Sequence, residues 1–375
     1  MSETLPPKGA LPRILVLSAY DAASHRRWRE QIKTLCPDYD WHHLALAPRY
    51  FRWRIRGNPL SWLNEPLVKQ RWDLVIATSM VDLATLRGLN PHLAATPCLL
   101  YMHENQFAFP VSSGQNASVD PQMVNLYSAL SAEQVVFNSA WNRDSFLSGV
   151  STFLDRLPDQ VPRELVDQLR HKARVLPVPI EDRLFLDRPA RPLPARPHLL
   201  WNHRWEYDKG PERLLGLLQV LRQRSIPFRL SVVGERFRQY PKVFDQIREA
   251  FDGRIDHWGY LENRASYDQL LSQADVVVST ALHDFQGLAM LEAMASGCVP
   301  LAPDRLAYRE YVPGSCRYAS HDQEPGREAE AAADQLACLM AGRPPECVPQ
   351  AWRASRLAAD YRSLFDQMIA GQAPG

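Results

Sequence analysis

The sequence is poor in cysteine and has no long apolar run, and each shortage excludes a class of protein. Six cysteines are scattered through 375 residues without a Cys-x-x-Cys pair, which argues against a zinc site or a disulfide framework. No apolar stretch is long enough to span a membrane. The N-terminal segment MSETLPPKGALPR lacks the apolar core of a signal peptide. We therefore expect a cytoplasmic protein whose thiols are reduced and mostly buried.

Neither sign of charge dominates the chain. It holds 43 lysines and arginines against 42 aspartates and glutamates, which gives a net charge of +1. This balance provides no general attraction for a polyanion, so binding to a nucleic acid would require a local basic surface.

Several catalytic signatures are also missing. No glycine-rich phosphate loop follows the first apolar run, and the chain shows no serine-centred elbow and no histidine pair at metal-binding spacing. The one Asp-x-Asp, at Asp38 and Asp40, precedes an apolar run, which is the wrong end of a strand for catalysis, and we interpret it as a turn. We therefore expect neither a metal nor a resident cofactor.

Short apolar runs recur through the first half of the chain. They are continuous rather than alternating, which is typical of strands buried on both faces of a parallel sheet. Helical patterns separate several of them; Trp28, Ile32 and Leu35, for example, fall on one helix face. Repeated βα units are therefore predicted. The predicted strands are 13–19, 43–47, 73–78, 98–103, 134–139 and 174–179.

A proline-rich stretch, 177–197, interrupts the pattern, and we interpret it as a hinge because proline disfavours helices and central strands. The βα pattern then restarts, which predicts a second doubly wound domain. Ligands of such sheets bind at the carboxyl ends of the strands. The second set of predicted strands is 198–203, 229–234, 255–260, 275–280 and 298–302, and the helices are 211–224, 239–251, 265–272, 287–295, 324–340 and 350–369.

The stretch HDFQGLAMLEAMASG, 283–297, places two acids around a glycine-led helix start. The free N–H groups of a helix start, with glycine allowing close approach at Gly287, suit a phosphate. Glu292 is suited to accept hydrogen bonds from sugar hydroxyls, and Asp284 precedes the helix. The alternative is an ordinary helix with an aspartate cap and an exposed glutamate.

The stretch WNHRWEYDKGPE, 201–212, follows the first strand of the second domain. Arg204 and Lys209 lie in a loop that ends at Gly210, with Pro211 as the first helical residue. Two cations beside a helix start suit a diphosphate. The alternative is a pair of solvated surface cations.

Two stretches of the first domain also follow predicted strands. In DAASHRRWRE, 21–30, we interpret Ser24 as the helix N-cap, with His25, Arg26 and Arg27 in the first turn. Cations at the first turn of a helix interact unfavourably with the helix dipole, and a bound anion would offset this unfavourable interaction. The alternative is a set of ordinary surface arginines.

In YMHENQFAFP, 101–110, four polar side chains follow a buried strand, and we expect them to face a ligand. They are His103, Glu104, Asn105 and Gln106.

The stretch RYFRWRIRGNPLSW, 49–62, alternates arginines with aromatic and apolar residues. Arginines bind phosphates and aromatic faces stack on unpaired bases, so an exposed loop of this composition suits RNA. The alternative is an edge strand that packs its aromatic side chains inward. The arginines are Arg49, Arg52, Arg54 and Arg56, and the aromatic residues are Tyr50, Phe51 and Trp53.

These motifs together resemble one family. HDFQGLAMLEAMASG, with Arg204 and Lys209 upstream, is similar to the donor site of GT-B retaining glycosyltransferases, whose Glu-x7-Glu motif has Asp284 in place of its first glutamate here. LSAYDAASHRRW, RWRIRGNPLSW, HENQFAFP and WNHRWEYDKGPE look more specifically like the tRNA-queuosine mannosyltransferases, over most of 13–315. Animal members of that family carry Gly-Gly where this chain has Ala22-Ala23.

The resemblance implies an α/β fold of the GT-B type, with two Rossmann-like doubly wound domains facing a cleft and a C-terminal helix that crosses back to the N-terminal domain. It implies an acceptor (tRNA) domain at 1–180, a nucleotide-sugar domain at 181–355 and the helix at 356–375. It also implies a cytoplasmic monomer that moves mannose from GDP-mannose to the cyclopentenediol of queuosine, at the wobble position of tRNA-Asp, with retention and without a metal.

The resemblance also assigns roles to residues of this sequence. Arg204 and Lys209 would hold the diphosphate, Glu292 the donor ribose and Asp284 the hexose hydroxyls, while His103 would lie beside the transferred sugar. Further donor contacts are expected from Gly287, Leu288, Ser24, His25, Gly259 and Tyr260. Contacts with tRNA are expected from Arg26, Arg27, Arg49, Arg52, Trp53, Arg54, Arg56, Glu104, Asn105 and Gln106.

Two other functions fit the same motifs. One is a GT-B enzyme that uses another nucleotide sugar and a lipid, glycan or small-molecule acceptor. The other is a non-catalytic protein that binds RNA or nucleotides. No motif distinguishes mannose from galactose or glucose, because these sugars differ only in hydroxyl orientation.

Overall fold

The computed structural model describes residues 10–109, 118–187, 191–237 and 239–371. Within these ranges the chain forms two compact units, divided after Pro179 and again before Ser355. Unit 1 holds the residues up to Pro179 and those from Ser355 onward, and unit 2 holds Ile180–Ala354. Residues 1–9, on which the expectation about a signal peptide rests, lie outside the described ranges.

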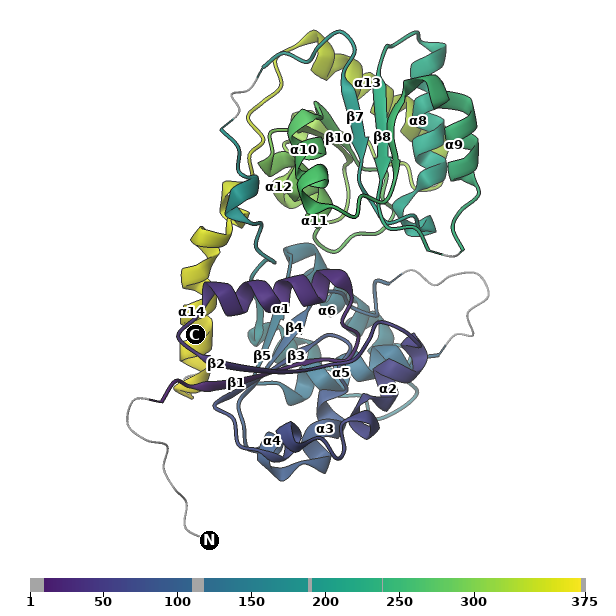
Figure 1. Cartoon of the computed structure of the whole chain (residues 1–375). Helices are drawn as coiled ribbons and strands as arrows, with labels where there is room; N and C mark the ends of the chain where they lie inside the picture. The colour runs from purple at the N-terminus through teal and green to yellow at the C-terminus, as the bar shows by residue number, and fades with distance from the viewer. Residues whose placement is uncertain (1–9, 110–117, 188–190, 238, 372–375) are drawn as a thin grey trace. The chain divides into compact units, whose positions relative to one another are not determined.

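Unit 1 is built on a six-stranded parallel sheet with the order β2-β1-β3-β4-β5-β6 (Figure 1). The chain order reverses at β1, so β1 and β3 flank the switch point of a doubly wound sheet. All six predicted strands are confirmed, with ends that differ by at most four residues from the prediction. The strands are β1 (Arg13–Ser18), β2 (Asp40–Ala45), β3 (Leu74–Thr78), β4 (Cys98–Met102), β5 (Gln134–Phe137) and β6 (Ala173–Val175).

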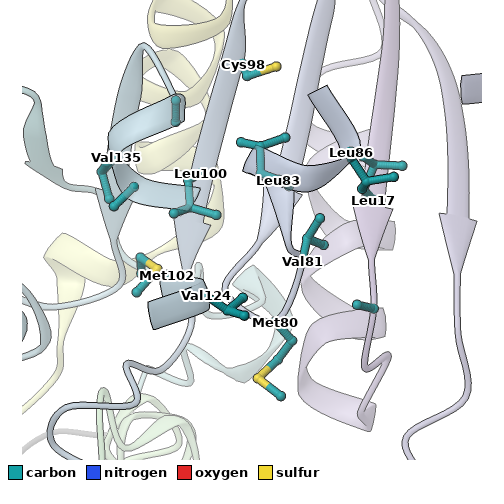
Figure 2. Packing of buried hydrophobic residues seen from close by; sticks show 14 of the residues in the cluster. Leu17, Met80, Val81, Leu83, Leu86, Cys98, Leu100, Met102, Val124 and Val135 are labelled. Atoms are coloured by element: carbon teal, nitrogen blue, oxygen red, sulfur yellow. The ribbon is translucent and has the colours of Figure 1, made fainter. Parts of the chain in front are cut away.

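Apolar strand residues make the core of unit 1, as the continuous runs predict. Leu17 of β1, Leu100 of β4 and Val135 of β5 belong to the same buried cluster as Leu83 and Leu86 of α3 (Figure 2). The helices are α1 (Ala23–Leu35), α2 (Phe51–Ser61), α3 (Leu83–Leu89), α4 (Pro91–Ala94), α5 (Asp120–Ser131), α6 (Ala140–Leu154), α7 (Leu165–His171) and α14 (Ala354–Ile369).

The last helix, α14, packs in unit 1 although nearly 180 residues separate it from the rest of that unit. The indole N–H of Trp28, on α1, donates to the hydroxyl of Tyr361 at 3.0 Å, and the two side chains are fully buried. Tyr39 donates to Asp366 at 2.6 Å. In Figure 1 the yellow α14 lies beside the purple α1.

The segment 49–62 is neither a loop nor an edge strand, which corrects both interpretations. It is the helix α2, preceded by Tyr50 in a left-handed conformation. The buried residues Ile55, Asn58 and Trp62 follow a spacing of three to four, which is the helical period. The alternating arginines concealed this period because they occupy the outer face.

Unit 2 has a second six-stranded parallel sheet with the order β12-β11-β10-β7-β8-β9. Its five predicted strands are confirmed, and the two-residue β12 was too short for periodicity to reveal. The strands are β7 (His198–Trp201), β8 (Arg229–Val233), β9 (Ile255–Gly259), β10 (Val276–Val278), β11 (Val299–Pro303) and β12 (Arg317–Tyr318).

The helices of unit 2 follow the predicted positions closely. α8 begins at Pro211, directly after Gly210, as the Gly-Pro pair predicts. Glu328 of α13 accepts hydrogen bonds from buried Arg305 and pairs with Arg213 of α8 at 2.9 Å. The helices are α8 (Pro211–Gln223), α9 (Val243–Phe251), α10 (Arg264–Gln273), α11 (Leu288–Ala295), α12 (Tyr308–Tyr311) and α13 (Pro325–Ala341).

Two expectations about composition can be compared with the structure. All six cysteines are free thiols, and four of them are buried. Among the helices in the described part of the chain, none has the length and apolarity needed to cross a membrane.

Candidate active site

Unit 2 contains a cavity of about 400 Å³ at the carboxyl ends of β7, β8 and β9. This volume falls within the range of pockets that enclose small ligands. Residues that follow the three strands line one part of it, including Arg204, Gly234 and Tyr260, and helices α10 and α11 line another part through Arg264 and Glu292. The cavity therefore lies where a doubly wound sheet binds its ligand.

Glu292 is a wall residue of this cavity and is only 4% exposed. One carboxylate oxygen accepts a hydrogen bond from Arg264 at 3.0 Å and the other from the Tyr267 hydroxyl at 3.3 Å. Asn202 donates to the same hydroxyl at 3.0 Å. The alternative of an exposed glutamate is therefore wrong. The sequence did not reveal these partners, because Arg264 and Tyr267 belong to a helix with no motif of its own.

Gly287 makes the turn that starts α11. Its φ is 78°, and a Cβ at this position would meet the Tyr311 hydroxyl at 2.2 Å. Only glycine adopts this backbone without strain and without that clash. Leu288 is then the first helical residue, and the Gly287 N–H donates to Asp284 at 3.0 Å. The helix start is consequently held by the acid that precedes it.

Lys209 is buried beside two acids. Its ammonium donates to the His283 carbonyl at 2.7 Å and lies 3.2 Å from Asp208 and 3.7 Å from Asp284. Burial opposes ionisation of Asp284, but the charge of Lys209, the neighbouring histidines and the Gly287 N–H together outweigh burial and lower the pKa of that carboxyl. Lys209 is 7% exposed, so the alternative of a solvated surface cation is wrong for this residue.

Arg204 and His203 complete the polar end of the cavity. Arg204 is half-exposed and pairs with Glu206 at 3.0 Å. Burial lowers the pKa of His203 to about 4, which keeps the imidazole neutral near pH 7. Tyr260 also lines the cavity and is exposed, and Gly259, which precedes it, has a φ of 98° with no atom within 4 Å of a Cβ built on it.

In unit 1, two histidines stack where β4 ends. The rings of His103 and His25 are 4.2 Å apart and nearly parallel, and Trp28 contacts His103 edge-on at 4.8 Å. Burial, with a contribution from His25, holds the pKa of His103 well below its usual value. His103 is therefore a neutral imidazole that can accept or donate a hydrogen bond.

Glu104 links the ends of β3 and β4 to α1. Its carboxylate accepts a hydrogen bond from Ser79 at 2.7 Å and lies 3.0 Å from Nε2 of His25. Ser79 was not singled out from the sequence, because a lone serine after a strand carries no signal. Together the three side chains form a continuous polar chain.

Asn105 does not face outward, which corrects the expectation that all four polar residues of 101–110 face a ligand. It is fully buried, donates to Asn142 at 2.9 Å and accepts from the N–H groups of Phe107 and Ala108. Asn105 therefore holds the turn after β4. Gln106 is partly exposed, and Pro110 lies outside the described residues.

The start of α1 also differs from the expectation. The N-cap is Ala22 and makes no side-chain bond, so Ser24 is an exposed residue of the first turn rather than the cap. Arg26 pairs with Asp21 at 3.3 Å, and Arg27 is partly buried. The helix starts earlier than predicted because the backbone of Ala22 adopts the N-cap conformation. The sequence contains no pattern that indicates this conformation.

The segment 49–56 exposes three of its four arginines and two aromatic side chains. Arg49, Arg52 and Arg56 are exposed, Arg54 is partly buried, and Arg56 pairs with Asp82 at 2.7 Å. The exposed aromatic residues are Tyr50 and Trp53. In the residues that the structure describes, no group of three His, Cys, Asp or Glu side chains is placed to hold a metal ion.

The fold and the second half of the chain define a class. Residues 196–341 match the family model "Glycosyl transferases group 1". A sucrose-phosphate synthase from Thermosynechococcus elongatus superposes with a TM-score of 0.68 at 17% identity, over 96% of this chain and all of that chain. The apo structure of OtsA gives 0.63 at 14% identity, over 96% of this chain and 99% of that chain. The chain is a group 1 glycosyltransferase with the two-sheet GT-B fold.

The first half narrows this class to one family. Residues 13–180 match the model "tRNA-queuosine alpha-mannosyltransferase N-terminal". The Drosophila melanogaster tRNA-queuosine alpha-mannosyltransferase is 33% identical over 312 residues, which cover 81% of this chain and 82% of that protein. The chain therefore belongs to the tRNA-queuosine alpha-mannosyltransferase family and is a mannosyltransferase acting on queuosine of tRNA.

A further relative has the donor in its name. A GDP-mannose:cellobiosyl-diphosphopolyprenol alpha-mannosyltransferase from Xanthomonas oryzae pv. oryzae (strain PXO99A) is 31% identical over 152 residues, which cover 38% of this chain and 37% of that protein.

Proposed function

We propose that this chain transfers mannose from GDP-mannose to the cyclopentenediol of queuosine at the wobble position of tRNA-Asp, with retention of the anomeric configuration. Membership of the family supports the sugar and the modified base, and the Xanthomonas relative supports GDP-mannose as donor. The observation that carries the proposal is the cavity of unit 2, where buried Glu292 lies at one wall and cationic Arg204 at another. The proposed enzyme acts as a cytoplasmic monomer.

The diphosphate is proposed to bind at the start of α11. Arg204 and Lys209 would contribute positive charge, and the Leu288 N–H would add a hydrogen bond where Gly287 allows close approach of the ligand. When GDP leaves, negative charge develops on its β-phosphate. Groups fixed in advance around that charge stabilise the transition state more than the ground state.

The nucleoside is proposed to occupy the rest of the cavity. Glu292 would accept hydrogen bonds from the ribose hydroxyls, in place of one that it now accepts from Arg264. The guanine base would then lie toward Gly259 and Tyr260. The open space around Gly259 fits the close approach of a planar base.

The hexose is proposed to contact Asp284. Asp284 is one methylene shorter than the usual glutamate of the motif, and its carboxylate already accepts from the Gly287 N–H. In the transition state the sugar becomes oxocarbenium-like. The acceptor oxygen would form the new bond to C1 as the bond to the phosphate breaks, and the leaving phosphate would take the acceptor proton.

The tRNA acceptor is proposed to bind unit 1, and the nucleotide sugar unit 2. Glu104 and Gln106 would contact the queuosine, and Arg26 and Arg27 nearby phosphates. The arginines of α2 would contact the phosphates of the anticodon loop, since they form a local basic surface on a chain with almost no net charge.

The proposal is tested by mass spectrometry of nucleosides from queuosine-containing tRNA after incubation with the purified protein. Each of GDP-mannose, UDP-glucose and UDP-galactose is supplied separately, and tRNA without queuosine is the control. We expect queuosine to gain one hexose with GDP-mannose alone. A gain with another donor would refute GDP-mannose as the donor, and sugar transfer only to a lipid or glycan would refute the RNA acceptor.

A further inference from the structure

Trp53 on the outer face of α2 lies flat against a glycine. A Cβ built on Gly57 would meet Cδ2, Cε2 and Cε3 of the Trp53 indole, each at 2.6 Å. Three ring atoms at equal distance from one point mean that the ring lies face-on over that point. Trp53 is 51% exposed and Gly57 is buried. One face of the indole therefore covers the glycine, and the side chain remains half open to solvent.

Gly57 makes α2 less stable than it would be with alanine. Glycine inside a helix is unfavourable because it loses more backbone freedom than any other residue. Helix formation alone would thus favour alanine at this position. What glycine provides is the space in which the indole of Trp53, one turn earlier, lies flat.

Tyr50, at the N-terminal end of the same helix, is a second exposed ring with an unfavourable backbone. Its φ and ψ are both 54°, in the left-handed region that bulky side chains avoid. The side chain is 70% exposed, and the guanidinium of Arg49 lies 5.7 Å from the ring centroid. Residues in such conformations persist where the surroundings fix them, often at functional sites.

The sequence around the two rings carries charge of one sign. No acidic residue occurs between Asp40 and Glu65, while the chain has four arginines from Arg49 to Arg56. Arg56 is held in place by its ion pair with Asp82. Flat aromatic faces flanked by arginines complement a polyanion whose bases are unpaired, because the bases of a duplex are stacked on one another.

We propose that Tyr50 and Trp53 form a stacking platform for unpaired bases of the RNA acceptor, and that Gly57 is the positioning residue that holds Trp53 in the stacking orientation. This proposal rests on the proposed function only for the identity of the RNA. Arg49 and Arg52 contact the phosphates on either side of the stacked bases.

The experiment measures binding of the full chain to a fluorescently labelled stem-loop with the anticodon-loop sequence, by fluorescence anisotropy. A duplex of equal length and anionic phospholipid vesicles are the comparison ligands. Trp53→Ala is expected to weaken stem-loop binding about tenfold or more. Gly57→Ala is expected to weaken it similarly, since the added methyl displaces the indole. The double variant should bind no more weakly than Trp53→Ala, because the glycine acts only through that ring.

The matched control is Gly88→Ala in α3, where a Cβ meets no atom within 4 Å. This variant should bind like the wild type. Gly57→Ala should also keep or raise the thermal unfolding temperature, because alanine favours the helix. A purely structural role for Gly57 predicts the opposite, a lower unfolding temperature with an intact affinity, and would overturn the proposal.

Tyr50→Asn provides a second variant. Asparagine tolerates the left-handed conformation, so the unfolding temperature should rise while stem-loop affinity falls several-fold. Wild-type affinity in both Tyr50→Asn and Trp53→Ala would overturn the platform. Equal affinity for the stem-loop and the duplex would also overturn the platform. Tighter binding to vesicles than to RNA would overturn it in favour of a membrane surface as the ligand. A wild type that binds the loop but transfers no mannose would refute the proposed function alone.

Discussion

The proposed diphosphate site of unit 2 and the α2 surface of unit 1 carry positive charge in opposite ways. Lys209 is buried and held by a carbonyl and two carboxylates. The arginines of α2 are mostly exposed, and exposed charges are screened by salt and water. The difference indicates that one substitution should disable the diphosphate site, whereas the α2 surface should lose affinity in small steps. The predictions below test this contrast in order of decreasing effect.

The largest effect is expected from Lys209→Ala. Loss of a preorganised charge at the leaving group should lower kcat for mannose transfer by about 100- to 1,000-fold. Steady-state kinetics with queuosine tRNA would measure it. Lys242→Ala, an exposed lysine of the same unit, is the control and should leave kcat unchanged. Equal turnover by the two variants would contradict the assignment of the diphosphate site.

Glu292→Gln should weaken binding of GDP about tenfold or more. Hydrogen bonds to a charged group contribute about 1.5–3 kcal/mol, and the neutral amide also replaces one acceptor with a donor. Isothermal titration calorimetry with GDP would measure the change. Glu249→Gln on the exposed face of α9 is the matched control. Wild-type GDP affinity for Glu292→Gln would remove this residue from the nucleotide site.

The pH dependence of stability should depend on His203. Its pKa is lowered by burial to about 4 in the folded state, so below the usual value near 6.5 the unfolded chain binds a proton that the folded chain does not. Stability is therefore lost as pH falls, by about 2 kcal/mol between pH 7 and pH 5. Urea unfolding at the two pH values should show a smaller loss for His203→Gln than for the wild type. His257→Gln, at an exposed histidine, is the control and should lose as much stability as the wild type. An equal loss of stability in His203→Gln would contradict the role of His203.

The smallest effect is expected from Arg52→Ala on the α2 surface. Removal of one phosphate contact should weaken tRNA binding a few-fold, and the slope of log affinity against log salt should decrease by about 0.7–0.9. Filter binding at several salt concentrations would measure both quantities. Arg248→Ala, on the exposed face of α9, is the control. An unchanged salt slope for Arg52→Ala would indicate that this arginine contacts no phosphate.

Local patterns were sufficient for much of the fold. The strands were predictable because a short, continuous apolar run such as 73–78 is typical of a strand that is buried on both faces of a sheet. The start of α8 was predictable because Gly210 and Pro211 each carry a backbone signal. The motifs identified Lys209 and Glu292 as candidate ligand contacts, but they indicated neither the burial of these side chains nor their partners.

The errors arose where contacts distant in sequence decide the structure. Asn105 is turned inward by its hydrogen bond to Asn142. The two residues are too far apart in sequence for a local pattern to predict this bond. The inner face of the helix in 49–62 is fixed by Asn58, which bonds to Met80 and Asp82 in the loop after β3. The pairing of Glu292 with Arg264 joins two helices across 28 positions of sequence.

The return of α14 to unit 1 has a consequence for synthesis of the chain on the ribosome. Trp28 emerges early, but the hydroxyl to which its indole donates belongs to Tyr361, which is added more than 300 residues later. Unit 2, Ile180–Ala354, leaves the exit tunnel complete before that hydroxyl is available. The domain that begins first must therefore finish last, and a chain truncated before Tyr361 retains every strand of the second sheet but leaves unit 1 without the hydroxyl to which Trp28 donates.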